Sequence, residues 1–314
     1  MTYIKLEKKI KSSDQKNTLS GVVYVPSGDI RGIFHLVHGM TEYIGRYEPL
    51  FESLAGEGYL CCGFDNLGHG NTAKDDSELG FIASEKGWEK LVDDTFIFQR
   101  QVMALYPDKR LIVMGHSMGS FMARTILAKY PENGISGCII CGTAWQPAAL
   151  LSTALPLCNA LCKNGGDRKP SVALQKLMFG SYNRRVERVR TSNDWLTRDN
   201  RIVDAYNEDP KCGFTATAGL YRDMLNGISF VQQADSLNAM DKDLPVLFTA
   251  GKEDPVGAYG QGVQQAADAF RKAGMKKVSV KLYPLCRHEI LNEINREDVY
   301  KDILGWIVDT ITNK

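Results

Sequence analysis

The feature that most constrains this chain is a serine enclosed by two glycines, where an apolar run meets a predicted helix. The run Leu111–Met114 leads directly into Gly115-His116-Ser117-Met118-Gly119, and residues 121–130 are predicted to form a helix that ends at Pro131. In a sharp turn from strand to helix, the serine sits on a strained backbone and its hydroxyl projects from the edge of a sheet. Glycines flank it because no side chain fits beside so tight a turn. Ser117 is therefore the candidate nucleophile.

The rest of the chain has to support this motif, because glycine accounts for 29 of the 314 residues and a short pattern also arises by chance. Predicted strands occupy residues 3–10, 19–25, 30–37, 59–64, 111–114, 137–141, 244–251 and 278–283. Predicted helices occupy residues 47–57, 85–105, 121–130, 259–273 and 298–311. This alternation predicts a mostly parallel central sheet flanked by helices, with an antiparallel pair at its N-terminal edge.

One long insertion, residues 145–227, breaks the alternation and contains no clear strand. Its apolar or helical segments are residues 147–162, 171–179 and 215–225. Pro156 is expected to interrupt the first of them. A helical block inside an α/β chain is expected to lie as a cap over the carboxyl ends of the strands. We therefore predict one α/β core, residues 1–144 and 228–314, that carries a helical cap formed by residues 145–227.

A serine nucleophile needs a general base, and the chain has five histidines: His35, His38, His69, His116 and His288. His35 lies within a predicted strand, and His116 directly precedes the nucleophile. His288 differs from the other four because it follows Ser117 in the chain and lies just beyond the last predicted strand, at the same edge of the sheet. His288 is the predicted base.

The acid that orients this base is expected on a loop between the serine and the histidine in chain order. Asp254 follows the predicted strand 244–251 and precedes His288 by 34 residues, enough for one helix and one strand. Glu253 is the alternative. Pro255 favours an extended backbone at residue 254, which suits the aspartate better. Asp254 is the predicted acid, which would hold the histidine in the correct tautomer.

The developing oxyanion needs two backbone N–H donors beside the nucleophile. Met118, the residue after the serine, is expected to supply one, and Met40, on the loop after the strand that ends at Val37, the other. We also expect substrate contacts from residues that flank these donors, namely His38, Gly39, Glu42 and His116.

Composition excludes several classes of partner. The chain has 38 Lys and Arg against 37 Asp and Glu, a net charge of +1, so no global field attracts nucleic acid. The charged N-terminus and the absence of a long apolar run predict a cytoplasmic protein. Eight cysteines, several in apolar strands, indicate buried thiols. Cys138 and Cys141 form a C-x-x-C within a predicted strand, where residues three apart point to opposite faces.

Four motifs together resemble the α/β-hydrolase superfamily, and within it the monoacylglycerol lipase and lysophospholipase group related to serine aminopeptidases S33. They are H-G-x-x-E-x-x-x-R-Y at 38–47, D-x-x-G-H-G at 65–70, G-H-S-M-G at 115–119 and R-H-E-x-x-N-E at 287–293. The resemblance implies an α/β-hydrolase fold, the triad Ser117, Asp254 and His288, and an oxyanion hole at Met40 and Met118. Two parts of the chain match no motif of the group. They are Asn71, where the group usually has arginine or a small residue, and the cap.

The predicted activity is hydrolysis of a small-molecule acyl ester through an acyl-enzyme, which requires no metal and no cofactor. The cap's many leucines and aromatic residues favour a medium- or long-chain acyl group, although for most of them packing within the cap is the simpler interpretation. Residues 147–162 could also contact a membrane or micelle. An aminopeptidase or amidase is the alternative, kept open by the cap's acidic residues Glu187, Asp194, Asp199, Asp204, Glu208 and Asp209. A hydrolase fold used only for binding would need a broken triad.

Overall fold

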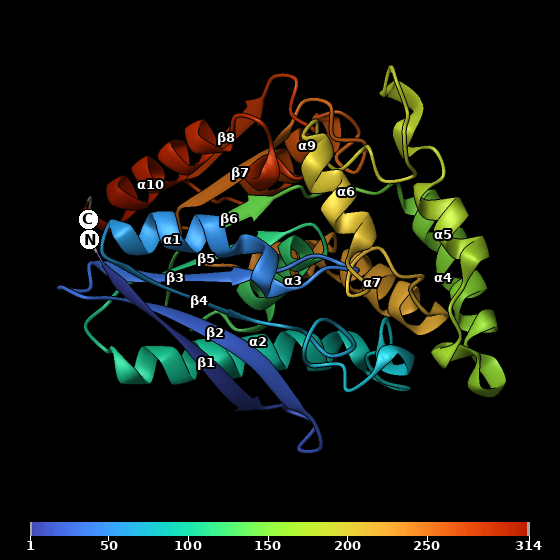
Figure 1. Ribbon diagram of the computed structural model, residues 1–314, viewed down its shortest axis with the longest axis horizontal. Helices are drawn as coiled ribbons and strands as arrows, with labels where there is room; N and C mark the ends of the chain where they lie inside the picture. The colour runs from blue at the N-terminus through green and yellow to red at the C-terminus, as the bar shows by residue number, and fades with distance from the viewer. Residues whose placement is uncertain (1, 313–314) are drawn as a thin grey trace.

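In the computed structural model, which describes residues 2–312, one eight-stranded sheet runs through the middle of the molecule (Figure 1). The strands are β1 (Tyr3–Lys11), β2 (Thr18–Pro26), β3 (Gly32–Val37), β4 (Tyr59–Phe64), β5 (Leu111–His116), β6 (Ile135–Cys141), β7 (Val246–Gly251) and β8 (Val278–Tyr283). Their order is β1-β2-β4-β3-β5-β6-β7-β8. The pairs β1–β2 and β2–β4 are antiparallel and all others are parallel, which confirms the predicted mostly parallel sheet.

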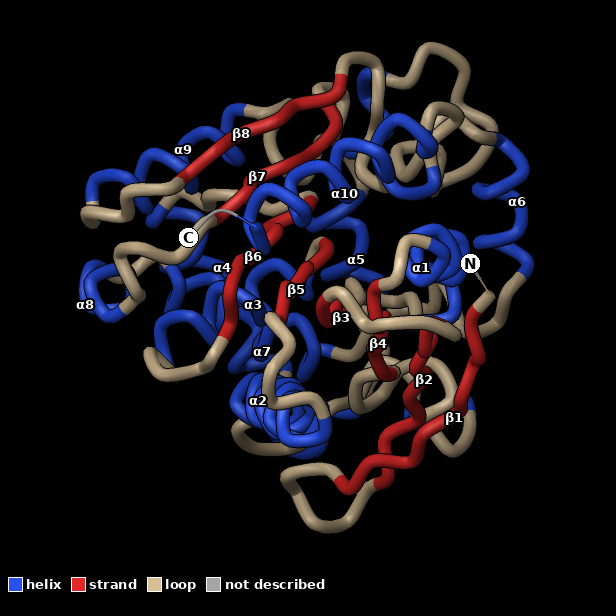
Figure 2. The backbone as a smooth tube through the Cα atoms, turned by 90° about the vertical axis from the view of Figure 1, so that its left-hand side faces the viewer, coloured by secondary structure: helices blue, strands red, loops and turns tan. Residues whose placement is uncertain are grey.

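Helices cover both faces of this sheet because its central strands are apolar on both sides. Every residue of β3, β4, β5 and β7 is buried. Helices α1 (Glu48–Gly56) and α10 (Arg296–Thr312) lie on one face, and α2 (Gly87–Leu105), α3 (Met118–Lys129) and α9 (Gln261–Lys272) on the other (Figure 2). Cys138 packs into the core of the second face and Cys141 into that of the first, as their spacing predicts.

The helices of residues 145–227 lie beyond the carboxyl ends of the strands (Figure 1). They are α4 (Ala148–Leu161), α5 (Val172–Phe179), α6 (Asn200–Glu208) and α7 (Ala218–Val231), and α8 (Ala234–Ala239) leads back to the core. Short 3-10 helices are η1 (Ile44–Tyr47), η2 (Asp76–Glu78), η3 (Lys163–Arg168), η4 (Tyr182–Arg185) and η5 (Ile290–Asn292). No helix within residues 2–312 has the length and apolarity needed to span a bilayer.

The prediction that Pro156 interrupts the first cap segment is wrong, because α4 continues through it. A proline inside a helix deprives the carbonyl four residues earlier, here that of Ser152, of its helical donor. Ser152 is exposed, so water can take the place of that donor.

Strand order determines where the loops meet. β3 lies between β4 and β5, so the chain leaves β3 and β5 toward opposite faces of the sheet, and a crevice opens between the two loops at their carboxyl ends. The loops after β7 and β8 end at the same edge. The four loops that carry the predicted oxyanion donors, nucleophile, acid and base therefore meet there.

Helix α7 joins the cap to the core through a glycine that packs against an indole. A Cβ on Gly227 would lie 2.0 Å from the Trp88 ring, which is buried and donates a hydrogen bond to Thr125. Overpacking costs about 1–3 kcal/mol, more than the roughly 0.5–1 kcal/mol that alanine gains over glycine in a helix. We expect Gly227→Ala to lower the free energy of unfolding in urea by about 1 kcal/mol.

Gly305 in α10 is the matched control, since a Cβ there meets no atom within 4 Å. Gly305→Ala should raise the free energy of unfolding by about 0.5–1 kcal/mol. Equal stabilisation by both substitutions would contradict the tight packing at Gly227.

Candidate active site

Ser117 occupies a strained turn between β5 and α3. Its backbone φ and ψ are 52° and −120°, a conformation that residues other than glycine rarely adopt. Its N–H donates to Cys141 O at 2.9 Å. A Cβ on Gly119 would lie 2.1 Å from Val37 O, and one on Gly115 would lie 2.2 Å from Gly119 O. The two glycines of the motif are therefore required by backbone contacts across the turn, as the sequence predicts.

The predicted base and acid are in contact. His288 Nδ1 lies 3.0 Å from Asp254 Oδ2, and both side chains are buried. A carboxylate can only accept, so Nδ1 carries the proton and Nε2 remains available to a serine hydroxyl. The other Asp254 oxygen accepts from Val256 N at 2.9 Å. The structure thus pairs His288 with Asp254, whereas the Glu253 side chain is half-exposed.

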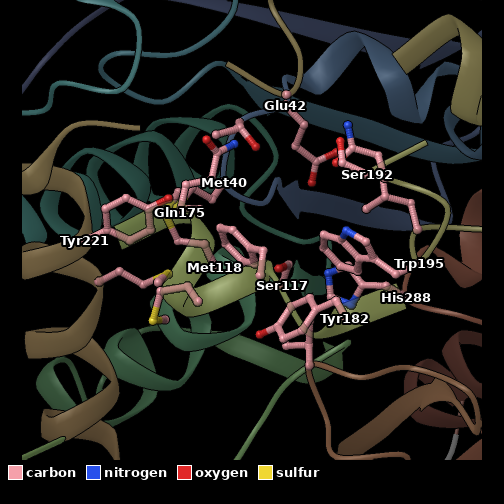
Figure 3. A pocket seen from close by; sticks show the side chains of 18 of the residues that line it. Met40, Glu42, Ser117, Met118, Gln175, Tyr182, Ser192, Trp195, Tyr221 and His288 are labelled. Carbon is pink, nitrogen blue, oxygen red and sulfur yellow. The ribbon is translucent and has the colours of Figure 1, made fainter. Parts of the chain in front are cut away.

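Ser117, Met118, Met40 and His288 line one cavity of about 370 Å³ (Figure 3). That volume lies within the range of small-molecule pockets. Much of the wall is apolar and belongs to α3, the cap and the part of α7 that continues beyond the cap: Phe121, Met178, Phe179, Phe214, Tyr221, Met224 and Ile228. Polar side chains also line it, including Gln175, Asn183, Ser192 and Asn193. The cavity can hold an apolar chain next to the serine and a polar group elsewhere along its wall.

Two of the predicted substrate-binding residues line the cavity and two do not. Glu42 and His116 contribute to the wall. His38 is fully buried behind it, where its Nε2 accepts from Asn66 N at 2.9 Å and its Nδ1 lies 2.7 Å from Gly39 O. Gly39 N donates to Glu42 Oε1 at 2.6 Å. These bonds of His38 and Gly39 shape the loop that carries Met40.

Behind the cavity lies a cluster of buried charges. Arg46 donates to Glu42 at 2.9 Å and binds both oxygens of Glu289 at 2.6 and 2.7 Å. The ring nitrogens of His116 lie 3.2 Å from Glu42 Oε1 and 3.4 Å from His288 O, so both face acceptors. The cluster connects the loop after β3 with the loop that carries His288.

Glu42 is ionised in this cluster, and its carboxylate raises the pKa of His116. Burial would raise the pKa of Glu42, but the hydrogen bond and charge of His116, followed by the charge of Arg46, hold it well below its ordinary value. Burial also disfavours the imidazolium of His116, yet the hydrogen bond and charge of Glu42 raise its pKa above the ordinary value.

The cap's acidic residues do not form an ammonium site. None of the six named in the sequence analysis lines the cavity in the described part of the chain. Asp194 and Asp199 accept hydrogen bonds from nearby backbone N–H groups of the cap, and Asp204 pairs with Arg190. Asp209 accepts from Tyr43 at 2.8 Å. Nothing in this arrangement favours the aminopeptidase alternative.

Sequence reasoning missed the cap residues that lie beside the predicted base, His288. The Trp195 ring lies 5.1 Å from that of His288, and Tyr182 contacts Trp195. Both line the cavity beside His288 (Figure 3). They lie in a segment without regular periodicity, so no local pattern indicates them.

Glu42→Gln tests the charge cluster, because glutamine keeps the shape but leaves Arg46 and His116 short of a negative partner. We expect the free energy of unfolding at pH 7 to fall by about 3 kcal/mol. The pKa of Glu42 is lower in the folded than in the unfolded state, so its stabilisation is present above about pH 4.3 and is lost as the pH falls through the folded value. In urea titrations, the difference in the free energy of unfolding between the wild type and Glu42→Gln should therefore become smaller as the pH is lowered into the acid range.

Glu57→Gln, at an exposed glutamate after α1, serves as the control and should leave the free energy of unfolding unchanged both at pH 7 and in acid. A Glu42→Gln deficit that stays constant from neutral pH into acid would contradict the assignment of an ionised Glu42.

Comparison with known proteins identifies relatives of this chain. A family model described as Serine aminopeptidase, S33, matches residues 28–295. The monoacylglycerol lipase of Mycolicibacterium smegmatis is 28% identical over 291 residues, 91% of either chain. The monoglyceride lipase of Homo sapiens is 26% identical over 298 residues, 90% of this chain and 84% of the human protein.

Among solved structures, a highly thermostable carboxyl esterase from Bacillus coagulans in complex with glycerol superposes with a TM-score of 0.91. It is 29% identical, and the alignment covers 99% of this chain and 100% of the esterase chain. The resemblance predicted from the four motifs is confirmed. Because the family model spans most of its length, the chain belongs to the serine aminopeptidase S33 family of α/β-hydrolases.

Proposed function

We propose that Ser117, His288 and Asp254 are the catalytic triad of an enzyme that hydrolyses medium- or long-chain acyl esters. The broader activity, that of a serine ester hydrolase of the monoacylglycerol lipase type, follows from the family and from lipase and esterase relatives. One observation carries the finer proposal: the strained serine and the His288–Asp254 pair meet at a cavity whose wall is largely apolar.

The proposed mechanism uses only groups of this chain and water. His288 Nε2 takes the proton of Ser117 as the hydroxyl attacks the acyl carbonyl, and then gives it to the leaving alcohol. The N–H groups of Met40 and Met118 stabilise the oxyanion. Asp254 keeps His288 in the tautomer with its proton on Nδ1 and stabilises the imidazolium. Water, deprotonated by His288, then releases the fatty acid.

We assign the acyl chain to the part of the cavity between α3 and the cap. Phe121 lies on α3, and Met178, Tyr221 and Met224 lie on α5 and α7. We propose a division of the chain into a core, residues 1–144 and 228–314, and a cap, residues 145–227, with α7 crossing the second boundary. The eight cysteines are all free, as is usual for proteins of the reducing cytoplasm, the compartment that we propose.

The outer surface of the cap supports contact with lipid. Exposed apolar side chains lie on α4 and α5: Leu150, Leu157, Leu161, Val172 and Leu177. Their neighbours in residues 163–190 include eight Lys or Arg, all exposed, and two acidic residues. Apolar side chains flanked by cations suit an anionic lipid surface. We propose that this cap face gathers substrate from membranes or micelles.

Steady-state hydrolysis of p-nitrophenyl esters from acetate to palmitate tests the activity. We expect kcat/KM to rise to a medium or long chain, because each buried methylene contributes about 0.8 kcal/mol. Ser117→Ala should abolish turnover. Faster hydrolysis of aminoacyl amides than of any ester would instead support the aminopeptidase alternative, and a lack of turnover with both would support a binding protein.

Asp254→Asn and Glu253→Gln form a matched pair for the acid. Asparagine at 254 favours the wrong histidine tautomer, and the equivalent change in a serine protease lowers kcat about 10⁴-fold. We expect a similar loss here, whereas Glu253→Gln should retain kcat within about twofold. The reverse result would assign the acid to Glu253.

For the lipid surface, we expect the double variant Leu157→Ser and Leu177→Ser to bind phosphatidylglycerol vesicles several-fold more weakly in sedimentation, because apolar area is lost. Turnover of dispersed monoacylglycerol should fall, while that of soluble p-nitrophenyl butyrate should not. Leu105→Ser, at an exposed leucine at the end of α2, is the control. Equal vesicle binding by all three proteins would exclude this face.

A further inference from the structure

We infer that residues Asp194–Gly213 of the cap form a fixed brace between the two catalytic loops, and that Arg287 and Tyr206 are positioning residues that attach it. The inference rests on the proposed roles of His288 and Met40. The first half of the brace lies against the loop after β8, which carries His288. The second half lies against the loop after β3, which carries Met40.

The first half of the brace is bonded to the histidine loop through the backbone of both segments. Glu289 N donates to Leu196 O at 2.7 Å, and His288 N donates to Trp195 O at 3.4 Å. The Trp195 ring covers the His288 imidazole at 5.1 Å. The position of the imidazole therefore depends on the cap segment as well as on Asp254.

Arg287 strengthens this attachment from the loop side. Its Nη1 donates to Asp194 O at 2.6 Å and to Thr197 O at 3.0 Å, two carbonyls of the cap segment. Its backbone N–H donates to Glu293 Oε1 at 2.9 Å, and Glu293 in turn pairs with Arg198 at 2.9 Å. The guanidinium thus binds carbonyls of the cap, and it does so one residue before the base.

The second half of the brace holds the oxyanion loop. Tyr206 on α6 donates its hydroxyl to Thr41 O at 3.0 Å, and Gly213 N donates to the same oxygen at 3.0 Å. Thr41 has a φ of 53°, a conformation that must be held by its surroundings. The Arg46 guanidinium lies over the Tyr206 ring at 4.8 Å. Both carbonyl contacts are made one residue after Met40.

A lid that opened at this segment would have to break the bonds to both loops and would displace the base. Exposed leucines mark α4 and α5 as the part of the cap that faces outward, whereas Trp195, Leu196 and Tyr206 of the brace are buried. Any opening for substrate is therefore assigned to residues 147–190, and residues 194–213 stay in place during turnover.

Kinetics with soluble p-nitrophenyl butyrate tests the two positioning residues. We expect Arg287→Ala to lower kcat by about 10- to 100-fold, as small misplacements of catalytic groups do, with KM changed by less than about threefold. Arg287→Lys should restore part of kcat, because the ammonium keeps the charge and the N–H donors but its shorter side chain ends before the position of Nη1. Tyr206→Phe should lower kcat several-fold. Arg100→Ala, at an exposed arginine of α2 far from the cap in sequence, is the control and should match the wild type.

Hydrogen exchange of the wild type gives an independent readout. The amide of Glu289 should be protected as strongly as amides of β7, while amides at the end of α5 exchange faster.

Unchanged kcat in both Arg287→Ala and Tyr206→Phe, each folded by circular dichroism, would overturn the inference, as would a Glu289 amide that exchanges as fast as those of α5. If Arg287→Ala fails to fold, Tyr206→Phe, which lacks only a hydroxyl, and the exchange data still decide. Full activity of His288→Ala would instead refute the proposed function itself.

Discussion

The close approach of the nucleophile turn to the end of β3 is the contact on which the rest of the site depends. Gly119 packs so tightly on Val37 O that even a methyl group would overlap it. This contact places the loop after Val37, with Met40, directly beside Ser117. It also accounts for the strained backbone of the serine, which is stable only because the surrounding strands and α3 allow no alternative.

Buried charge holds the remaining loops around this turn. Removing carboxylates and a guanidinium from water is costly, so a buried cluster is stable only when every member is paired. Glu42, Arg46 and Glu289 meet that condition, with His116 facing an acceptor on each side. The cluster connects the loop after β3, which carries Met40, to the loop that carries His288. Substitution of any residue of this cluster would therefore displace both loops.

We propose different tasks for the two halves of the cap. Residues 147–190 expose apolar and basic side chains and form part of the cavity wall. Residues 194–213 are bonded to the core at Thr41 and at the histidine loop. An insertion of this kind can change substrate preference through its outer half while its inner half preserves the geometry of the reacting groups.

The sequence by itself determined the sheet, most helices and the strand-turn-helix that carries the proposed nucleophile, because apolar periodicity and the glycine turn at Ser117 are local patterns. It also indicated His288 by chain order and favoured Asp254 over Glu253. Only the tertiary structure decided that Asp254 contacts His288. It also decided that the Trp195 ring packs on His288, and that α4 continues through a proline. These outcomes depend on contacts between segments far apart in the chain and on solvent access to single carbonyls, which no local pattern encodes.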